Sequence, residues 1–186
     1  LANANKLNFE LVEALTQQVS HFHSTIAIAP ADSTYGDPAQ VYAPMEQNFS
    51  QILSMLSDKD HQVQITQLRD WTQSTFERLA PLIEQRRLQG MVRDCHGDMH
   101  LGNITMYEDR VTLFDCIEFN DDFRWIDTIS DIALLVMDFE IFGLQQYANR
   151  FLNNYLEETG DYAGLKLLNF YKSYRAIVRA KISLLM

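Results

Sequence analysis

The sequence predicts a mainly α-helical fold of the α+β class, with a small β-hairpin beside the residues best suited to chemistry. Glycine and proline number only 7 and 4 in 186 residues, so turn signals are sparse and helices should predominate. Apolar residues recur at helical spacing through most of the chain. Between residues 103 and 115 the pattern changes to two β-prone runs joined by a tight turn, which predicts the hairpin.

Residues 1–90 are expected to form a first helical part. Apolar side chains every three or four residues predict one helix over about 7–23 and another from Met45 to Leu56. A loop rich in proline, glycine and aspartate separates them. Asp58 should cap a third helix, which Pro81 should kink or split, and Gly90 should end this part.

Residues 91–118 carry the change in pattern. A short strand is expected over 91–94, and the hairpin pairs 103–107 with 111–115 through a turn at 108–110. The stretch between the first strand and the hairpin has no helical or strand periodicity, so we expect it to be a loop.

Residues 119–186 are expected to form a second helical part. The segment 123–142 is apolar almost all round, which predicts a buried helix. An amphipathic helix should follow over 144–155 and end near Gly160. The last segment, 161–186, should be a helix whose basic side chains form a solvated face.

The net charge of −10 is concentrated in one segment. Residues 91–140 carry 12 acidic and 3 basic side chains, which argues against a nucleic-acid partner. Clustered acids suit divalent metal ions or a cationic substrate, although a solvated acidic face would have the same composition. The acidic side chains at 118, 121 and 122 could line a cationic pocket or an exposed loop.

Other features of the chain set its expected cellular context. No apolar run reaches the length of a transmembrane helix, so no membrane partner is expected. Two cysteines give no disulfide framework and favour a reducing, cytoplasmic setting. The chain starts at Leu1 and stops inside an apolar, helix-like run, so both ends look like cuts within a longer protein.

Four side chains between 95 and 116 form the candidate site. Because hairpin strands can bring Asn103 and Asp115 side by side, an amide oxygen and a carboxylate could together hold a hard cation such as Mg²⁺. Asp98, on the preceding loop with His96, could accept a proton from a hydroxyl held next to the metal. The sequence therefore predicts a metal-assisted site at the loop and hairpin.

His96, Asp98, Asn103 and Asp115 resemble the catalytic loop and metal-binding aspartate of the protein-kinase-like fold. The sequence of residues 96–103 is similar to that of the aminoglycoside phosphotransferase and choline kinase family, with Gly97 where most protein kinases have arginine. The flanking residues 113–120 and 124–133 resemble a bacterial branch of this family that has no settled substrate. Some members of that branch are joined to a P-loop kinase domain. The resemblance covers nearly all of residues 1–186, as the C-terminal lobe alone.

The resemblance implies a role for each residue. Asp98 would be the catalytic base or the carboxylate that orients the acceptor, and His96 would brace the loop by hydrogen bonds. Asn103 and Asp115 would bind Mg²⁺ and, through it, ATP. His100 would contact either the nucleotide phosphates or the loop.

The resemblance also implies that Asp131, on the expected buried helix 123–142, would hold the backbone of the loop that carries Asp98. The complete protein would then be an ATP- and Mg²⁺-dependent kinase that transfers the γ-phosphoryl group to a hydroxyl of a small molecule.

The N-terminal lobe of that family supplies a phosphate-covering loop and a lysine, and this sequence has no counterpart of either. Half of the ATP site would be missing, so this chain alone should bind ATP weakly and turn over little. Its nucleotide-facing side, with Ile104, Met106, Leu113 and Ile117, would be exposed and would favour self-association.

Two other functions fit parts of the pattern. A pseudokinase-type binding or regulatory module would keep the fold without turnover. A metal-dependent hydrolase would collect Zn²⁺ on Cys95, His96, Asp98 and His100, which leaves Asn103 and Asp115 without a role.

Overall fold

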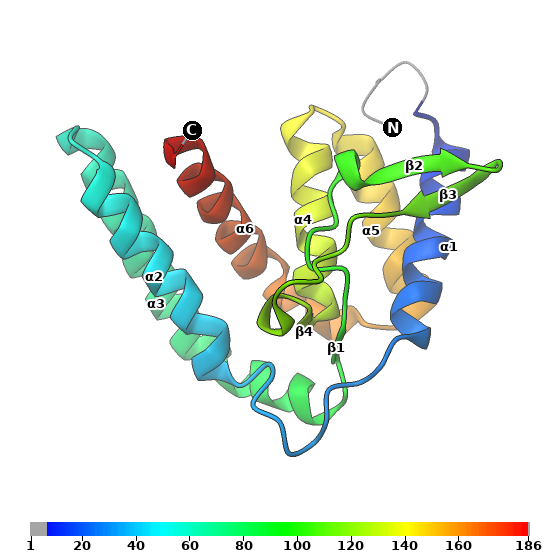
Figure 1. Cartoon of the computed structure of the whole chain (residues 1–186), viewed down its shortest axis with the longest axis horizontal. Coiled ribbons are helices and arrows are strands. Elements are labelled where there is room, and N and C mark those ends of the chain that lie inside the picture. The colour runs from blue at the N-terminus through cyan, green and yellow to red at the C-terminus, as the bar shows by residue number, and fades with distance from the viewer. Residues whose placement is uncertain (1–6, 186) are drawn as a thin grey trace.

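The computed structural model describes residues 7–185, which form a helical body and a long helical arm (Figure 1). In the body, α1 (Phe9–Thr25), α4 (Thr128–Ile141) and α5 (Gln145–Thr159) pack together. The arm consists of α2 (Pro38–Met55) and α3 (Lys59–Leu88), and α6 (Leu165–Leu185) lies between arm and body, in contact with α4 and α2. The predicted mainly helical fold is confirmed.

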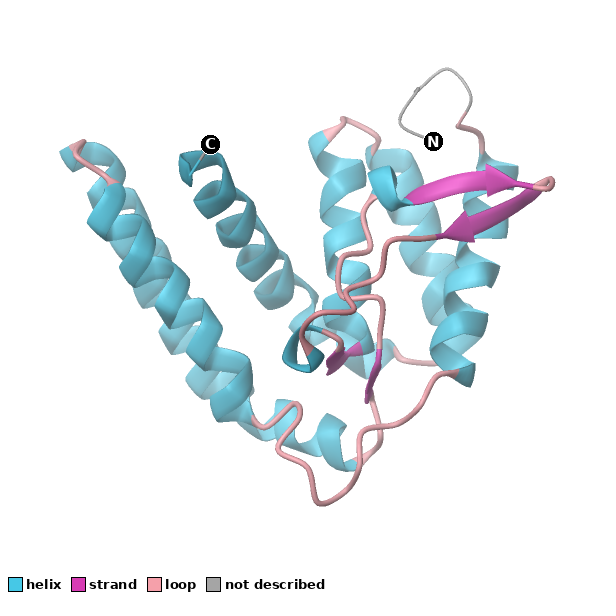
Figure 2. Cartoon of the chain, viewed as in Figure 1, coloured by secondary structure: helices cyan, strands magenta, loops and turns pink. Residues whose placement is uncertain are grey.

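Two small antiparallel strand pairs lie on the body (Figure 2). β1 (Val92–Asp94) pairs with β4 (Trp125–Asp127), and β2 (Ile104–Tyr107) pairs with β3 (Arg110–Leu113). The turn of the second pair contains two residues, both with positive φ, which suits the twist of a hairpin. The hairpin is confirmed, but its turn is one residue shorter than expected, β2 begins one residue later, and β3 spans Arg110–Leu113 instead of 111–115.

The first helical part differs from the prediction at two prolines. α2 begins at Pro38, which was expected in the loop, because proline at the first helical position loses no hydrogen bond. α3 runs through Pro81 without a break, so the expected split is wrong. Leu82 and Ile83 pack into the main core beside Pro81, and this packing outweighs the lost backbone bond. Asp58 caps α3, as predicted, by accepting from the His61 N–H at 2.8 Å.

The second helical part differs where the buried helix begins. Residues 125–127 form strand β4, which follows a short 3₁₀ turn, η2 (Asp121–Phe123), instead of belonging to the expected helix over 123–142. α4 starts at Thr128 because Asp127 caps it, accepting from the Ile129 N–H at 2.8 Å. Every residue from Thr128 to Phe139 is buried, so the prediction of an all-round buried helix is confirmed.

The last two helices follow the prediction with small shifts. α5 ends at Gly160, whose φ of +71° is the left-handed conformation typical of a helix end. A 3₁₀ turn, η3 (Tyr162–Gly164), then leads into α6, which therefore begins four residues later than expected.

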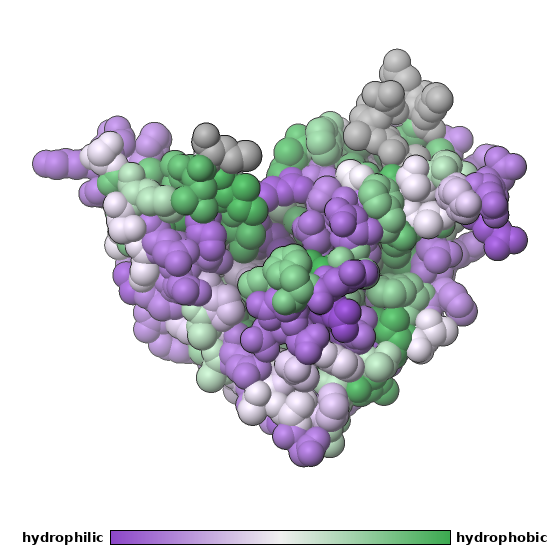
Figure 3. All heavy atoms as spheres, viewed as in Figure 1, coloured by the Kyte–Doolittle hydropathy of each residue, from purple (hydrophilic) through white to green (hydrophobic). Residues whose placement is uncertain are grey.

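Two separate apolar clusters stabilise the molecule. The main cluster joins α1, α4, α5, α6 and the hairpin with Met45 of α2 and Ile83 of α3, whereas a small one, Phe49, Ile52 and Ile177, makes a second contact between the arm and α6. A notch opens at the upper edge of the space-filling view, between the side formed by α2, α3 and α6 and the side formed by α4, and hydrophobic side chains lie along the former (Figure 3). Among residues 7–185, no helix is both long and apolar enough to cross a lipid bilayer.

A buried ion-pair network ties the end of the arm to the body. The guanidinium of Arg86, which is 1% exposed, donates to Asp127 at 2.7 and 2.9 Å and to Asp161 at 2.5 and 2.7 Å. Three segments that lie far apart in the chain therefore meet at one side chain.

Candidate active site

The loop between β1 and the 3₁₀ turn η1 (Leu101–Asn103) is held from below by Asp131 of α4. The carboxylate of Asp131 accepts from the His96 N–H at 3.1 Å and from the Gly97 N–H at 3.0 Å. It also accepts from Nε2 of His23 at 3.1 Å. The contact between Asp131 and the loop backbone is therefore the one the resemblance implies.

Asp131 is fully buried and ionised. Burial on its own would raise its pKa, but the hydrogen bond from His23 and the nearby positive charge of Arg175 outweigh burial and hold the pKa below its usual range. A charged acceptor binds backbone N–H groups more strongly than a neutral one does, so the loop conformation is firmly fixed.

His96 links the loop to the end of the hairpin. Its buried ring donates from Nε2 to the Phe114 carbonyl at 2.8 Å and accepts at Nδ1 from the Asp98 N–H at 3.3 Å. These contacts match the bracing expected of His96. Its importance for catalysis stays a prediction.

Gly97 makes room for the chain that crosses the loop. Its φ is +81°, and a Cβ atom there would lie 2.6 Å from the Phe123 carbonyl oxygen. A larger residue would meet both backbone strain and a collision with backbone. Glycine at this position is therefore a requirement of the local packing.

Asp98 and Asn103 lie in direct contact. Nδ2 of Asn103 donates to the Asp98 carbonyl at 3.1 Å and lies 3.4 Å from Oδ2 of the Asp98 carboxylate. Asn103 is buried, whereas the Asp98 side chain is 48% exposed. The Asp98 carboxylate is thus anchored through its neighbour yet accessible to a substrate.

The hairpin brings the backbone that leads into Asp115 against Asn103. The Phe114 N–H donates to the Asn103 carbonyl at 3.1 Å, so Asp115 follows the residue that faces Asn103. Asp115 lies beyond the strand, is exposed, and has a φ of +60°, unusual for a residue with a side chain. The backbone contact supports the predicted proximity, and strain at such a position is common in functional sites.

The donor set fits Mg²⁺. Nδ2 of Asn103 is engaged with Asp98, which leaves Oδ1 as the atom able to bind a cation. The carboxylate of Asp115 is the second oxygen donor, and Mg²⁺ prefers oxygen ligands.

His100 contacts the loop. Its Nδ1 accepts from the Gly102 N–H at 3.0 Å, and its Nε2 lies 3.6 Å from Oδ2 of Asp98. Of the two roles expected, the structure shows contact with the loop, and a contact with nucleotide phosphates stays a prediction.

The zinc site of the hydrolase alternative does not form. In the described range 7–185, the one group of three His, Cys, Asp or Glu side chains close enough to share an ion is His23, Cys95 and Asp131. Burial, with the nearby charge of Asp131, raises the pKa of the Cys95 thiol well above its usual value, so the thiolate that zinc needs is disfavoured. The four ligands expected from the sequence do not converge, because His96 and Cys95 point their polar atoms at backbone carbonyls.

Two arginines of α6 hold the loop from the side, contrary to the expectation of a solvated basic face. Arg175 donates from Nη1 to the Gly97 carbonyl at 3.1 Å. Arg179 pairs with Asp138 at 2.6 Å, and Asp138 in turn accepts from the Leu101 N–H at 2.8 Å. The spacing of four residues, which puts both arginines on one face of a helix, was the available signal in the sequence.

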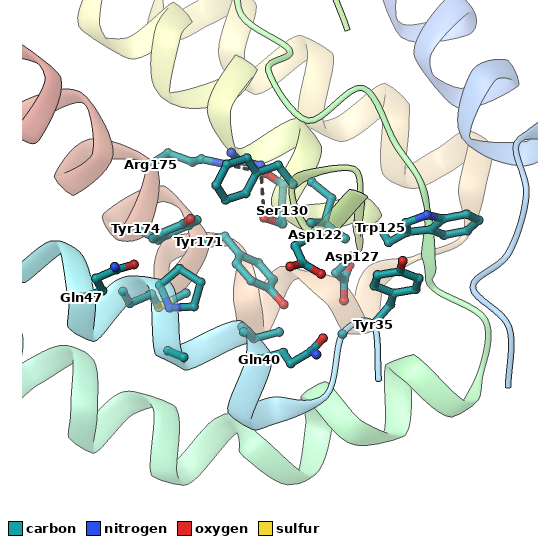
Figure 4. Close-up of a pocket in the computed structure, with 17 residues that line it drawn as sticks. Tyr35, Gln40, Gln47, Asp122, Trp125, Asp127, Ser130, Tyr171, Tyr174 and Arg175 are labelled. Atoms are coloured by element: carbon teal, nitrogen blue, oxygen red, sulfur yellow. Dashed lines mark hydrogen bonds between the residues drawn. The ribbon is translucent and has the colours of Figure 1, made fainter. Parts of the chain in front are cut away.

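A pocket of about 400 Å³ lies between α2, α6 and the segment from η2 to β4 (Figure 4). A second hollow of about 320 Å³ contains Asp98 and His100. Arg175 lines both, so the larger pocket opens beside the catalytic loop.

The nucleotide-facing side of the hairpin is only partly as expected. Met106 is 44% exposed, but Ile104 is buried in the main core, so the expectation for Ile104 is wrong. Ile104 and Met106 are two residues apart in the strand and therefore point to the same face. Their burial differs because the body covers Ile104, whereas Met106 lies near the hairpin tip.

Comparison with known proteins agrees with this geometry. A sequence profile of the phosphotransferase enzyme family matches residues 2–168. Uncharacterized proteins of Mycobacterium tuberculosis and Mycobacterium bovis are 28% identical over 171 residues, which is 92% of this chain. The chain spans about a third, 34%, of the length of these relatives. No solved structure gives a significant match.

The family match covers most of the chain and includes the whole loop and hairpin. The chain therefore belongs to the phosphotransferase enzyme family.

Proposed function

We propose that the complete protein is an ATP- and Mg²⁺-dependent kinase that transfers the γ-phosphoryl group to a hydroxyl of a small molecule. The observation that carries this proposal is the contact between an accessible Asp98 and a buried Asn103, with Asp115 beside them. Phosphoryl transfer requires positioning and charge neutralisation more than covalent chemistry, and these three side chains supply both.

Each side chain has a defined part in the proposed reaction. The Asp98 carboxylate orients the acceptor hydroxyl and takes its proton as the oxygen attacks phosphorus. Oδ1 of Asn103 and the carboxylate of Asp115 would hold Mg²⁺, which neutralises charge on the transferring phosphoryl group. His96 touches no reacting atom in this scheme and keeps Asp98 at its position through the loop.

The nucleotide would need further groups. Within residues 7–185 no lysine lies on any of the four strands, so a strand-borne lysine that pairs with the phosphates has no counterpart there. We therefore expect residues 1–186 alone to bind ATP weakly. The two cysteines, Cys95 and Cys116, are both free, which is in keeping with the cytoplasmic location we propose.

A pseudokinase-type module remains the rival proposal, and turnover distinguishes the two. In the complete protein, Asp98→Asn should reduce phosphoryl transfer from labelled ATP, to water or to pooled hydroxyl compounds, by about 100-fold or more. Binding of a non-hydrolysable ATP analogue with Mg²⁺ should stay near the wild-type level, since Asp98 acts on the acceptor.

Asp32→Asn is the matched control, because Asp32 is an exposed carboxylate in the loop before α2. Near-normal turnover of Asp98→Asn would refute the role of Asp98. No turnover by the wild-type protein with any acceptor would favour the binding module.

A further inference from the structure

The larger pocket indicates which acceptors the proposed kinase would take, and the inference rests on that proposed function. Three charged side chains line the pocket: Asp122, Asp127 and Arg175. Asp122 is exposed at the rim, and both carboxylate oxygens of Asp127 are engaged by Arg86, so neither is free to pair with a ligand. Arg175 is the charged side chain inside the pocket that has hydrogen-bonding groups free for a ligand.

Arg175 makes no direct ion pair with a carboxylate among residues 7–185. In the described part of the chain, no carboxylate oxygen lies within 4.0 Å of its guanidinium. Its hydrogen bonds go to neutral oxygens instead: Nη1 to the Gly97 carbonyl at 3.1 Å and Nε to the Ser130 carbonyl at 3.4 Å. Oγ of Ser130 lies 3.5 Å from Nη2 (Figure 4).

The guanidinium is therefore fixed in place with donors to spare. Arginine has five N–H groups, and the three contacts above engage three of them at most. A planar guanidinium with two free N–H groups matches a carboxylate or a phosphate. Its partner Gly97 directly precedes Asp98, so an anion bound here would lie beside the reacting hydroxyl.

The rest of the pocket wall is mostly apolar, with one unsatisfied polar atom. Tyr35 and Trp125 stack with ring centroids 5.4 Å apart, and α2 adds Val41 and Met45. The hydroxyl of Tyr171 points into the pocket (Figure 4), is buried, and has no hydrogen-bond partner among residues 7–185. A buried polar group without a partner costs about 1–3 kcal/mol, so a polar atom of a ligand would be favoured there.

We propose that the acceptor is a small hydroxyl compound that carries an anionic group, a carboxylate or a phosphate. The anion pairs with Arg175, the apolar body lies against the aromatic wall, and a polar atom meets the Tyr171 hydroxyl. This differs from the cationic substrate that the acidic composition suggested. A cation would meet an unpaired guanidinium, and apart from rim-exposed Asp122 the pocket offers it no unpaired carboxylate.

Calorimetric titration of the 186-residue chain, without nucleotide, would test this inference. The probes are phenyl-ring compounds that differ in charge: phloretate (a carboxylate), phenyl phosphate, tyrosol (neutral) and tyramine (an ammonium). At least one anionic probe should bind about tenfold more tightly than tyramine, since a charge-assisted bond of this kind contributes about 1.5–3 kcal/mol. The ratio of phloretate to phenyl phosphate distinguishes a carboxylate from a phosphate ligand.

Variants separate the parts of the site. Arg175→Gln should bring the ratio of anionic to cationic affinity close to one, and Arg175→Lys should keep part of the preference. Tyr171→Phe should weaken phloretate and tyramine alike, because both carry a phenol hydroxyl, and should leave the ratio of their affinities unchanged. Arg150→Gln, which alters an arginine paired with Glu13 outside both hollows, is the matched control and should bind as wild type.

The inference is overturned if tyramine binds as tightly as the anionic probes, or if Arg175→Gln keeps the preference. It is also overturned if neither anionic probe binds to a chain whose circular dichroism shows the expected helices. Because these titrations need neither ATP nor turnover, their failure leaves the kinase proposal to its own test with Asp98→Asn. Failure of that test would in turn leave a measured anion preference standing.

Discussion

Asp131→Asn is the substitution whose effect the structure defines most completely. The two oxygens of Asp131 accept three hydrogen bonds, from His23 Nε2 and from the backbone of His96 and Gly97. An asparagine has almost the same shape but keeps only one acceptor oxygen. Whichever way its amide is turned, at least one buried backbone N–H faces an NH₂ group.

The cost follows from counting those contacts. One unsatisfied buried N–H costs about 1–3 kcal/mol, and each remaining bond loses about 1 kcal/mol when its acceptor becomes neutral. The free energy of unfolding should therefore fall by about 3 kcal/mol. Urea unfolding followed by circular dichroism measures this, with the exposed Asp32→Asn as a control that should change stability by less than about 0.5 kcal/mol.

The pH dependence gives a second test. The pKa of Asp131 is lower in the folded state, so its contribution to stability is present above the unfolded value of about 4. That contribution is lost as the pH falls below this value toward the folded pKa. The difference between wild type and Asp131→Asn should shrink in that range. A loss below about 1 kcal/mol at neutral pH, or a difference that grows in acid, would refute the assignment of Asp131 as the anchor of the loop.

Three further results are expected. In the complete protein, Asp115→Ala should weaken binding of Mg²⁺ with a non-hydrolysable ATP analogue more than Asn103→Ala does, because it removes a full charge. A Mg²⁺ titration of both variants measures this, and the opposite order would mean that the two ligand roles are reversed. Arg86→Met should lower the free energy of unfolding by about 3–5 kcal/mol, measured in urea, since it leaves two buried carboxylates without their cation. The 186-residue chain should self-associate in sedimentation experiments through the hairpin face. Met106→Glu should reduce this association, Tyr162→Ser should not, and a monomer at all concentrations would contradict it.

The parts of the fold that the sequence predicts are those with local causes. α1 and α5 have regular apolar spacing, and Asp58 and Gly160 mark helix ends through their own backbone chemistry. The loop and hairpin could be placed because two β-prone runs flank a tight turn, and because His96, Asp98, Asn103 and Asp115 resemble a known catalytic loop. Their proximity in the structure depends on a hairpin whose strands are adjacent in sequence.

The parts that could not be predicted depend on contacts between distant segments. β4 has three residues, and its partner β1 lies more than thirty positions earlier, so no periodicity reveals the pair. In the sequence, Arg86 is one of several charged residues near the end of α3, and nothing marks it as different. In the structure it is buried and pairs with two carboxylates from other segments. Arg175 was expected in solvent because a helical wheel shows which residues share a face, but not what that face contacts.

The position of α2, which has one face in the main cluster and another on the larger pocket, has a consequence for how this protein can evolve. α2 forms one wall of the larger pocket, while the catalytic loop is held by α4 and α6. Val41 and Met45 of α2 pack into the main cluster, but Gln40, Ala43 and Gln47 line the pocket and belong to neither cluster, so these three positions can change without disturbing the packing beneath Asp98. Substitutions at a few positions on this one helix could therefore change which acceptor binds. The loop that carries Asp98 would stay the same.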